Sequence, residues 1–215
     1  NSNSQDNLNG DLIVAVNDII EDGKGHQYRF LERLGSGTFG QVFHVVEISD
    51  SNNPCHYAIK ISKSLRQYQR QAREEVRLHQ TAQIQLKEHE QSGLGALLDS
   101  FSYHGHVCIV MEKLFWDLYK VLKTRNHRGL PISLVQIVAK HIIPVLNGFK
   151  RIGLIHTDIK PENIVLADEN SANVKLIDLG SAITAENTDD FCKTTIFYRA
   201  PEILFGSNNY GFGID

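Results

Sequence analysis

The sequence predicts an α+β fold in which an antiparallel sheet comes first and a mostly helical part follows. Three observations support this. Residues 28–112 contain short β-rich runs separated by glycine and polar turns, with one helical segment among them. Residues 133–152 repeat apolar side chains at helical spacing, and residues 164–177 form two apolar runs around a polar turn. At 215 residues, with 41% apolar and 22% charged residues, the composition is that of one or two globular domains.

Charge and composition exclude several kinds of partner. The net charge of −3 and a pI of about 6.4 predict no nucleic-acid partner. No uninterrupted apolar run reaches the length of a membrane span and no signal peptide is visible, so no membrane partner is expected. Three widely spaced cysteines, Cys55, Cys108 and Cys192, suit neither a disulfide framework nor a metal site. The expected compartment is therefore reducing, the cytoplasm or the nucleus.

The first 27 residues read as an extension ahead of the first domain. Residues 1–10 are rich in Asn, Ser and Asp, which predicts a disordered lead-in. Residues 12–16 are a short apolar run for which three readings stay open: an added strand, a strap against the sheet, or a merely collapsed patch. Because the first residue is Asn1 rather than Met, we expect the chain to be a piece of a longer protein.

A glycine-rich run, GSGTFG at residues 35–40, lies between two predicted strands. Taken alone, G-x-G-x-x-G is a weak signal, because dinucleotide-binding folds use the same letters before a helix. Here the β-rich residues 41–48 follow, so we predict a glycine-tipped hairpin whose backbone can close over phosphates. A dinucleotide-dependent oxidoreductase is an alternative function for this chain, and it would need a helix after Gly40. The P-loop pattern does not occur, which excludes that class of ATPase.

A buried ion pair is predicted between the third strand and the first helix. Residues 56–61 alternate as a strand that places Ala58 and Lys60 on one face. The following helical segment has Glu75 on its inward stripe, whereas Glu74 points to solvent. A buried carboxylate needs a partner, and Lys60 is the obvious one. From the strand alone, an exposed strand lysine is an equally good interpretation of Lys60.

Two further strands and a long helix complete the predicted scaffold. Residues 97–101 and 107–112 are the strands, joined by a turn at residues 104–105. Met111, at the end of the second, reads both as a core residue and as a wall of a base pocket. Ser133 is the predicted N-cap of the long helix, and Gly153 ends it.

Several reactive side chains fall within two short stretches. These are HTDIKPENIVL, residues 156–166, and VKLIDLG, residues 174–180. The apolar runs in these stretches predict a β-hairpin in which Asn163 and Asp178 lie opposite each other at the open end. An amide oxygen beside a carboxylate suits Mg²⁺ next to phosphates. Upstream, Pro161 holds Asp158 and Lys160 in an extended loop. Asp158 could accept a hydroxyl proton and Lys160 could stabilise a transferring phosphoryl group.

The pattern H-x-D-x-K-x-x-N followed by D-x-G resembles the catalytic and metal loops of eukaryotic protein kinases. YRAPE, residues 198–202, is similar to the CMGC group. DLIVAVNDII, EKLFWDLYKVLK and GLPISLVQIVAKHI are most similar to its dual-specificity tyrosine-regulated (DYRK) family, Yak-like branch, with the CLK kinases as second choice. The resemblance runs from about residue 11 to the last residue. It implies a two-lobed kinase-like fold: a five-stranded antiparallel N-lobe with one helix at 28–111, and a partial helical C-lobe at 112–215.

The resemblance also implies a function and its residues. A serine/threonine kinase would move the ATP γ-phosphate to protein substrates with Mg²⁺ held by Asn163 and Asp178. Asp158 would be the base, Lys160 would steady the γ-phosphate, and Thr195 would position both. Arg199 resembles the CMGC arginine linked to proline next to the target. Lys60 and Glu75 would be the activating pair, and the implied ATP-contacting residues are Leu34, Gly35, Ser36, Gly37, Thr38, Phe39, Gly40, Val42, Ala58, Lys60, Met111, Glu112, Leu114 and Val165.

Several positions depart from the family pattern. Thr157 replaces the arginine that grips an activation-loop phosphate, and Asp190 and Cys192 stand where DYRK kinases carry a Tyr-x-Tyr pair. His79 takes a position that is usually apolar. Asp215 matches the aspartate that opens the central C-lobe helix, and the chain stops there. The rival reading is therefore a truncated, catalytically inactive nucleotide-binding or scaffold module. The sequence predicts no oligomeric state.

Overall fold

The computed structural model describes residues 5–49, 53–186, 195–207 and 210–215. The chain divides into two compact units, each described by itself. The first unit contains Asn1–Arg77 and Ala96–Lys113, and the second contains Leu78–Gly95 and Leu114–Asp215. The residues of the predicted N-terminal extension thus group with the first unit, and so do Glu112 and Lys113.

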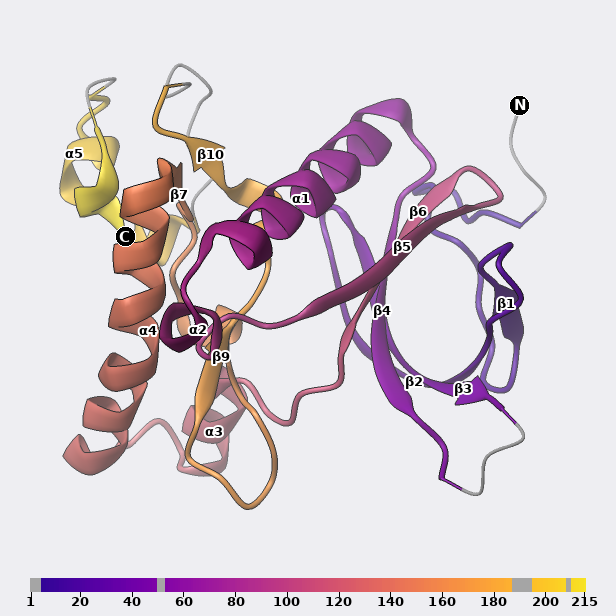
Figure 1. Ribbon diagram of the computed structural model, residues 1–215, viewed down its shortest axis with the longest axis horizontal. Helices are drawn as coiled ribbons and strands as arrows, with labels where there is room; N and C mark the ends of the chain where they lie inside the picture. The colour runs from indigo at the N-terminus through magenta and orange to yellow at the C-terminus, as the bar shows by residue number, and fades with distance from the viewer. Residues whose placement is uncertain (1–4, 50–52, 187–194, 208–209) are drawn as a thin grey trace. The chain divides into compact units, whose positions relative to one another are not determined.

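The first unit is built on a six-stranded antiparallel sheet with the order β1-β2-β3-β4-β6-β5 (Figure 1). The strands are β1 (Ile19–Glu21), β2 (Gln27–Gly37), β3 (Gly40–Ile48), β4 (His56–Ser62), β5 (Leu97–Tyr103) and β6 (His106–Glu112). The sheet has one strand more than the five predicted. The addition is β1, a three-residue edge strand from the N-terminal extension that pairs with β2.

One face of this sheet buries the main apolar core of the first unit. Side chains that alternate along β2, β3 and β4, such as Phe30, Val45 and Ile59, are at most 1% exposed. A second cluster joins Ala72 of helix α1 (Arg66–Gln85) to Leu97, Val107 and Ile109. The period of two in the strands and the helical period of α1 thus each place apolar side chains in one of these two buried clusters.

Residues 5–14, which we call the N-terminal strap, belong to the ordered part of the first unit. The prediction of a disordered lead-in at residues 1–10 is wrong for residues 5–10. Asn7 forms a local turn there, with its side-chain oxygen accepting the backbone N–H groups of Asn9 and Asp11 at 2.9 and 3.0 Å. Leu12 is 5% exposed and packs into the sheet core, so the strap reading of residues 12–16 is the one that the structure supports.

The second unit is mostly helical. Its helices are the second half of α1, α2 (Glu88–Gln91), α3 (Leu118–Thr124), α4 (Ile132–Ile152) and α5 (Pro201–Leu204). Two small antiparallel sheets pair β7 (Leu154–Ile155) with β10 (Ile183–Thr184), and β8 (Ile164–Leu166) with β9 (Val174–Leu176). Short 3₁₀ turns occupy Pro161–Asn163, Leu179–Ser181, Ile196–Tyr198 and Phe212–Ile214.

Helix α4 supplies much of the core of the second unit. Val145 and Phe149 are at most 1% exposed and pack with Leu176 and Leu179. The helix begins at Ile132 with Pro131 as its N-cap, so the prediction that Ser133 caps it is wrong by two positions. It ends, as predicted, at Gly153, whose φ of 74° suits glycine.

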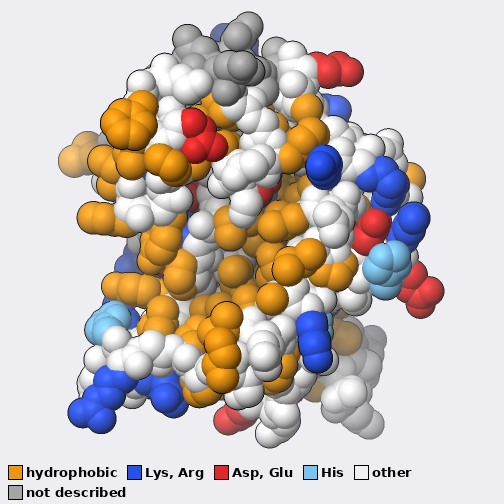
Figure 2. Space-filling model, turned by 90° about the vertical axis from the view of Figure 1, so that its left-hand side faces the viewer, with side chains coloured by type: hydrophobic (Ala, Val, Ile, Leu, Met, Phe, Trp, Pro, Cys, Tyr) orange, Lys and Arg blue, Asp and Glu red, His pale blue; other side chains and the backbone are white. Residues whose placement is uncertain are grey.

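Helix α4 is also long and apolar enough, by length and composition alone, to cross a membrane. A core helix passes the same test, and 22% of the relevant window is buried in this unit. Figure 2 shows apolar side chains gathered over the face that carries α4 and α5. The exposed apolar residues of these elements and the turn before α5 include Ile132, Val135, Ile143, Ile196, Phe197, Leu204 and Phe205.

Candidate functional site

The glycine run forms the tight hairpin that the sequence predicts. β2 and β3 pair as far as Gly37 opposite Gly40, which leaves Thr38 and Phe39 as the turn. A strand follows Gly40, so the fold is not that of a dinucleotide-binding domain. A Cβ at Gly40 would lie 2.0 Å from the carbonyl oxygen of Ile61, so this position accepts only glycine. The preceding residues 35–38 are exposed, which leaves their backbone accessible to a ligand.

Strand register brings the predicted nucleotide residues of the first unit into two rows. Gly35 pairs with Val42, and Val42 pairs with Lys60. Two residues before Lys60 on β4, Ala58 pairs with Met111 of β6. These pairings place the glycine hairpin, the strand lysine and the small Ala58 side chain on neighbouring strands.

The predicted ion pair between Lys60 and Glu75 is present. Lys60 Nζ donates to both carboxylate oxygens of Glu75, at 2.7 and 2.8 Å. The side chains are 15% and 4% exposed, so this pair is nearly dry. Glu74, by contrast, is half exposed and binds Arg77 one turn along the same helix. The helical period therefore selects which of two adjacent glutamates reaches the strand lysine.

The remaining predicted nucleotide residues are divided between the units. Leu34, Ser36, Thr38 and Phe39 belong to the glycine hairpin of the first unit. Glu112 ends β6, where its side chain accepts the backbone N–H of Ala96 at 2.6 Å. Leu114 and Val165 belong to the second unit. There Val165, on β8, is 6% exposed and pairs with Asp117.

In the second unit, Asp158, Lys160 and Thr195 form one hydrogen-bonded cluster. Lys160 Nζ donates to Asp158 Oδ2 at 2.6 Å and to Thr195 Oγ1 at 2.8 Å. The hydroxyl and the backbone N–H of Thr195 both donate to Asp158 Oδ1, at 2.7 and 3.0 Å. Three residues that the sequence places up to 37 positions apart are thereby held around one carboxylate.

This cluster keeps the Asp158 carboxylate charged. Burial alone would raise the pKa of Asp158, but the hydrogen bonds from Lys160 and Thr195 together hold it below its ordinary value. Asp158 is therefore ionised at neutral pH and already has donors on both oxygens. A carboxylate in this state can accept a proton from a hydroxyl group placed beside it.

Asn163 and Asp178 lie at the open end of the β8–β9 hairpin, but their register differs from the prediction. Asn163 pairs with Ile177, whose N–H donates to the Asn163 carbonyl at 2.9 Å, so Asp178 lies one residue beyond. Asp178 has a left-handed backbone, with φ of 68°. The side-chain NH₂ of Asn163 donates to Asp158, which directs its side-chain oxygen elsewhere.

A second carboxylate, that of Asp215, binds the backbone of the loop that carries Asp158. Asp215 accepts the backbone N–H groups of His156 and Thr157, at 2.7 and 2.8 Å. Burial raises the pKa of Asp215, although these bonds oppose the shift. Thr157 adds a bond from its hydroxyl to the Ser181 carbonyl. Asp215, which matches the aspartate that opens the central helix in the family pattern, thus holds the backbone of the loop that carries Asp158.

Four further positions bear on the site or on the family pattern: Glu162, His79, Asp190 and Cys192. Glu162 was not singled out, yet its Oε2 atom is buried and has no hydrogen-bond partner among the described residues. The only signal in the sequence for Glu162 is its place between the two predicted site residues Lys160 and Asn163. The ring of His79 is 2% exposed and bonds the Gly95 carbonyl at 2.6 Å, as a core histidine does. Asp190 and Cys192 lie outside the described residues.

Comparison with known proteins agrees with this geometry. Residues 28–215 match the protein kinase domain family. The chain is 38% identical over 203 residues to the probable serine/threonine-protein kinase yakA of Dictyostelium discoideum, a match covering 94% of this chain and 14% of that protein. It is 34% identical to the dual specificity protein kinase YAK1 of Saccharomyces cerevisiae, covering 95% of this chain and 25% of that protein. It is 32% identical to the human dual specificity tyrosine-phosphorylation-regulated kinase 3, covering 100% of this chain and 35% of that protein.

The chain thus spans less than half the length of each of these curated relatives. The family match includes residues of both compact units, among them the glycine hairpin and the Asp158 cluster. The chain belongs to the protein kinase family, and within it to the DYRK kinases related to YAK1.

Proposed function

We propose that this chain carries the catalytic machinery of a serine/threonine kinase that transfers the ATP γ-phosphate to protein hydroxyl groups. The observation that carries the proposal is the cluster of Asp158, Lys160 and Thr195. A carboxylate held charged by an ammonium and a hydroxyl is suited to receive a hydroxyl proton while phosphoryl charge is neutralised nearby. Family membership agrees with this chemistry.

The proposed reaction forms a bond between the substrate hydroxyl oxygen and the γ-phosphorus and breaks the bond from that phosphorus to the β-phosphate oxygen. The hydroxyl proton goes to Asp158, and ADP leaves with the electron pair. Lys160 can bind oxygens of the transferring group because its ammonium shares this site. Thr195 keeps Asp158 Oδ1 occupied, so Oδ2 is the oxygen shared with Lys160.

The side chains present fit a magnesium ion bound together with ATP. Asn163 offers a side-chain oxygen, since its NH₂ is used on Asp158, and Asp178 offers a carboxylate. Mg²⁺ favours this kind of site, with one or two protein oxygens completed by phosphate and water. Among the described residues no group of three or more His, Cys, Asp or Glu forms a metal cage, which also favours a metal that arrives with phosphates. The bound ion would neutralise phosphate charge.

For the nucleotide, the proposal uses the first unit. The exposed glycine hairpin offers backbone N–H groups to phosphates, and Glu75 fixes the Lys60 ammonium on the neighbouring strand. An intact Lys60–Glu75 pair together with an intact Asp158 cluster favours a working enzyme over a non-catalytic scaffold module.

The free thiols of Cys55 and Cys108, among the described cysteines, support a reducing compartment, the cytoplasm or the nucleus.

The substrate class is tested with purified chain, Mg-ATP labelled at the γ-phosphate, and three peptides that differ only in Ser, Thr or Tyr at one position. The proposal predicts label on the Ser and Thr peptides and none when Mg²⁺ is removed by a chelator. Because Arg199 resembles the arginine linked to proline, a proline placed after the target is expected to increase transfer. Label on the Tyr peptide alone would contradict the serine/threonine assignment.

A further inference from the structure

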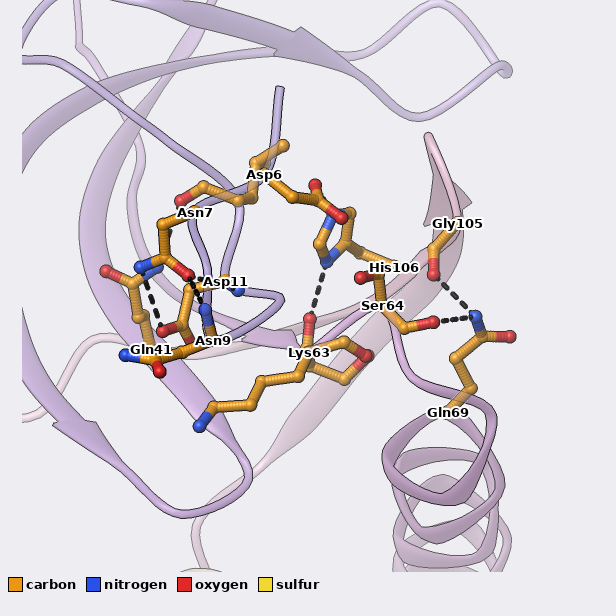
Figure 3. A network of polar contacts seen from close by, with 12 residues as sticks. Asp6, Asn7, Asn9, Asp11, Gln41, Lys63, Ser64, Gln69, Gly105 and His106 are labelled. Atoms are coloured by element: carbon orange, nitrogen blue, oxygen red, sulfur yellow. Dashed lines mark hydrogen bonds and ion pairs between the residues drawn. The ribbon is translucent and has the colours of Figure 1, made fainter. Parts of the chain in front are cut away.

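The N-terminal strap is bound to the sheet of the first unit by backbone and side-chain hydrogen bonds (Figure 3). The backbone N–H of Ser64 donates to the Gly10 carbonyl at 2.9 Å. The buried side chain of Gln41 donates to the Leu12 carbonyl at 3.0 Å. Ser64 lies just beyond β4, and Gln41 follows Gly40 in β3. The strap therefore contacts β3, which leaves the glycine hairpin, and the residues just beyond the neighbouring strand β4.

One end of the strap is held by a histidine from a distant part of the chain. His106, at the start of β6, has a side chain that is 0% exposed. Its Nδ1 lies 2.7 Å from the Ser62 carbonyl oxygen, and its Nε2 lies 2.9 Å from Asp6 Oδ1. The Asp6 side chain is only 10% exposed. The ring thus bridges β4 and the strap in a nearly dry setting.

This bridge fixes the number of protons that it holds. A carbonyl oxygen cannot donate, so His106 Nδ1 must carry hydrogen. A neutral ring would then face the Asp6 carboxylate with a lone pair on Nε2, opposite a lone pair on Oδ1. A hydrogen bond between these two atoms needs one proton more than a neutral imidazole and a carboxylate possess. The count is the same whichever of the two atoms carries that proton.

We propose that His106 and Asp6 form a proton-dependent latch that holds the N-terminal strap against the first unit and positions the glycine hairpin. As the pH rises and this extra proton is lost, the bridge loses its hydrogen bond and the strap loses this attachment. The direction of this pH dependence follows from the number of protons. The docked state holds one extra proton, so it is favoured in acid and weakens as the pH rises.

Other charged or titratable groups near the latch have their own partners. Asp11 of the strap accepts from the Asn7 side chain. The Lys63 ammonium, beyond β4, lies over the ring of Tyr68 in α1, 5.6 Å from its centre. His104, in the β5–β6 turn, packs edge-on against Tyr103. Among the described side chains, Asp6 supplies the carboxylate that bonds the His106 ring.

The latch reaches the glycine hairpin through the end of β4. Ser62, which accepts from His106, is followed by Lys63, whose backbone N–H donates to the Phe39 carbonyl at 3.0 Å. Phe39 is in the hairpin turn, and Gln41 is bonded to the strap. Release of the strap therefore removes support from both ends of the segment 39–41. An effect on nucleotide binding rests on the proposed function, whereas the latch itself does not.

Amide hydrogen exchange on the full chain tests the latch without any catalytic readout. The Ser64 amide reports strap docking and the Lys63 amide reports the hairpin contact. Protection factors, in which the intrinsic pH dependence of exchange has been divided out, are measured from pH 5.5 to 8.5. One linked proton predicts that both protection factors fall as the pH rises, by up to about tenfold per pH unit. Flat or rising protection at Ser64 or Lys63 would overturn the proposal.

Two single-atom variants of the strap sharpen the test. In Asp6→Asn, the new amide can donate to Nε2 of a neutral His106, so docking is retained and the pH dependence is lost. In Asp11→Asn, the same charge is removed from a carboxylate that bonds Asn7 and not the ring, so the pH dependence remains as in the parent chain. An Asp6→Asn chain that keeps the parent slope, or an Asp11→Asn chain that loses it, would contradict the latch.

Discussion

Thr195 donates to Asp158 Oδ1 twice, through its hydroxyl at 2.7 Å and through its backbone N–H at 3.0 Å. The hydroxyl also accepts from Lys160 Nζ, so one side chain joins the proposed base to the proposed phosphate-binding cation. This arrangement makes Thr195 a positioning residue. Its backbone N–H is kept in any substitution except proline, whereas its hydroxyl can be removed or kept.

Thr195→Val removes the hydroxyl and keeps the shape, so kcat for phosphate transfer is expected to fall about 10- to 100-fold while KM for ATP changes little. The matched control is Thr195→Ser, which keeps the hydroxyl and should retain most of the rate. Steady-state kinetics with a peptide substrate separates kcat from KM. A Thr195→Ser variant as impaired as Thr195→Val would show that the methyl group, and not the hydroxyl, matters.

The lowered pKa of Asp158 predicts where activity is lost in acid. Lys160 and Thr195 hold this pKa below the ordinary carboxyl value, so activity should persist at neutral pH and fall only as the pH drops through the lowered pKa. Thr195→Val removes one of the hydrogen bonds that lower it, and the acid limb should move to higher pH. The pH dependence of kcat/KM measures this. An acid limb unmoved by the substitution would contradict the assignment of that limb to Asp158.

Glu75→Gln is expected to destabilise the chain because it removes the negative charge that binds the Lys60 ammonium in a nearly dry site. Breaking a buried pair costs about 3 kcal/mol of unfolding free energy. The adjacent Glu74→Gln breaks only an exposed pair with Arg77 and should cost about 0.5 kcal/mol or less. Urea denaturation of both variants gives the comparison. Equal losses would mean that the helical period does not select Glu75 as the buried partner.

Glycines of the hairpin should differ sharply in their tolerance of alanine. Gly40→Ala would force its Cβ into the Ile61 carbonyl and should destabilise the first unit by about 3 kcal/mol. Gly37 has open space where a Cβ would be, so Gly37→Ala should change stability by less than about 1 kcal/mol. Thermal melts report the difference. A Gly40→Ala chain as stable as Gly37→Ala would contradict the close approach of β3 to β4.

Local patterns in the sequence were enough to predict most of the fold. Alternation in β4 and the helical stripe of α1 predicted the Lys60–Glu75 pair, because each residue lies within a regular element whose period fixes its direction. The β8–β9 hairpin followed from two apolar runs around turn formers. Its register did not, since the turn length alone cannot say whether Asn163 faces Ile177 or Asp178.

Long-range contacts were beyond these patterns. The composition of residues 1–10 indicates disorder, yet Asp6 reaches His106, 100 positions away, and that contact orders the strap. The edge strand β1 has only three residues, with a single buried side chain, too few for a period to emerge. Of the candidate site, the closeness of Asp158, Lys160 and Asn163 was predictable from their spacing, whereas the role of Thr195 required the family resemblance.

The most direct test of the proposed kinase function is phosphate transfer by the parent chain and by Asp158→Asn, measured beside ATP binding in the same preparations. The parent chain is expected to label a Ser or Thr peptide from γ-labelled Mg-ATP. Asp158→Asn should bind Mg-ATP with similar affinity and lose transfer by about a thousandfold or more. A variant that transfers phosphate at the parent rate would remove Asp158 from its proposed role. A parent chain that binds Mg-ATP and transfers nothing would support the scaffold reading instead.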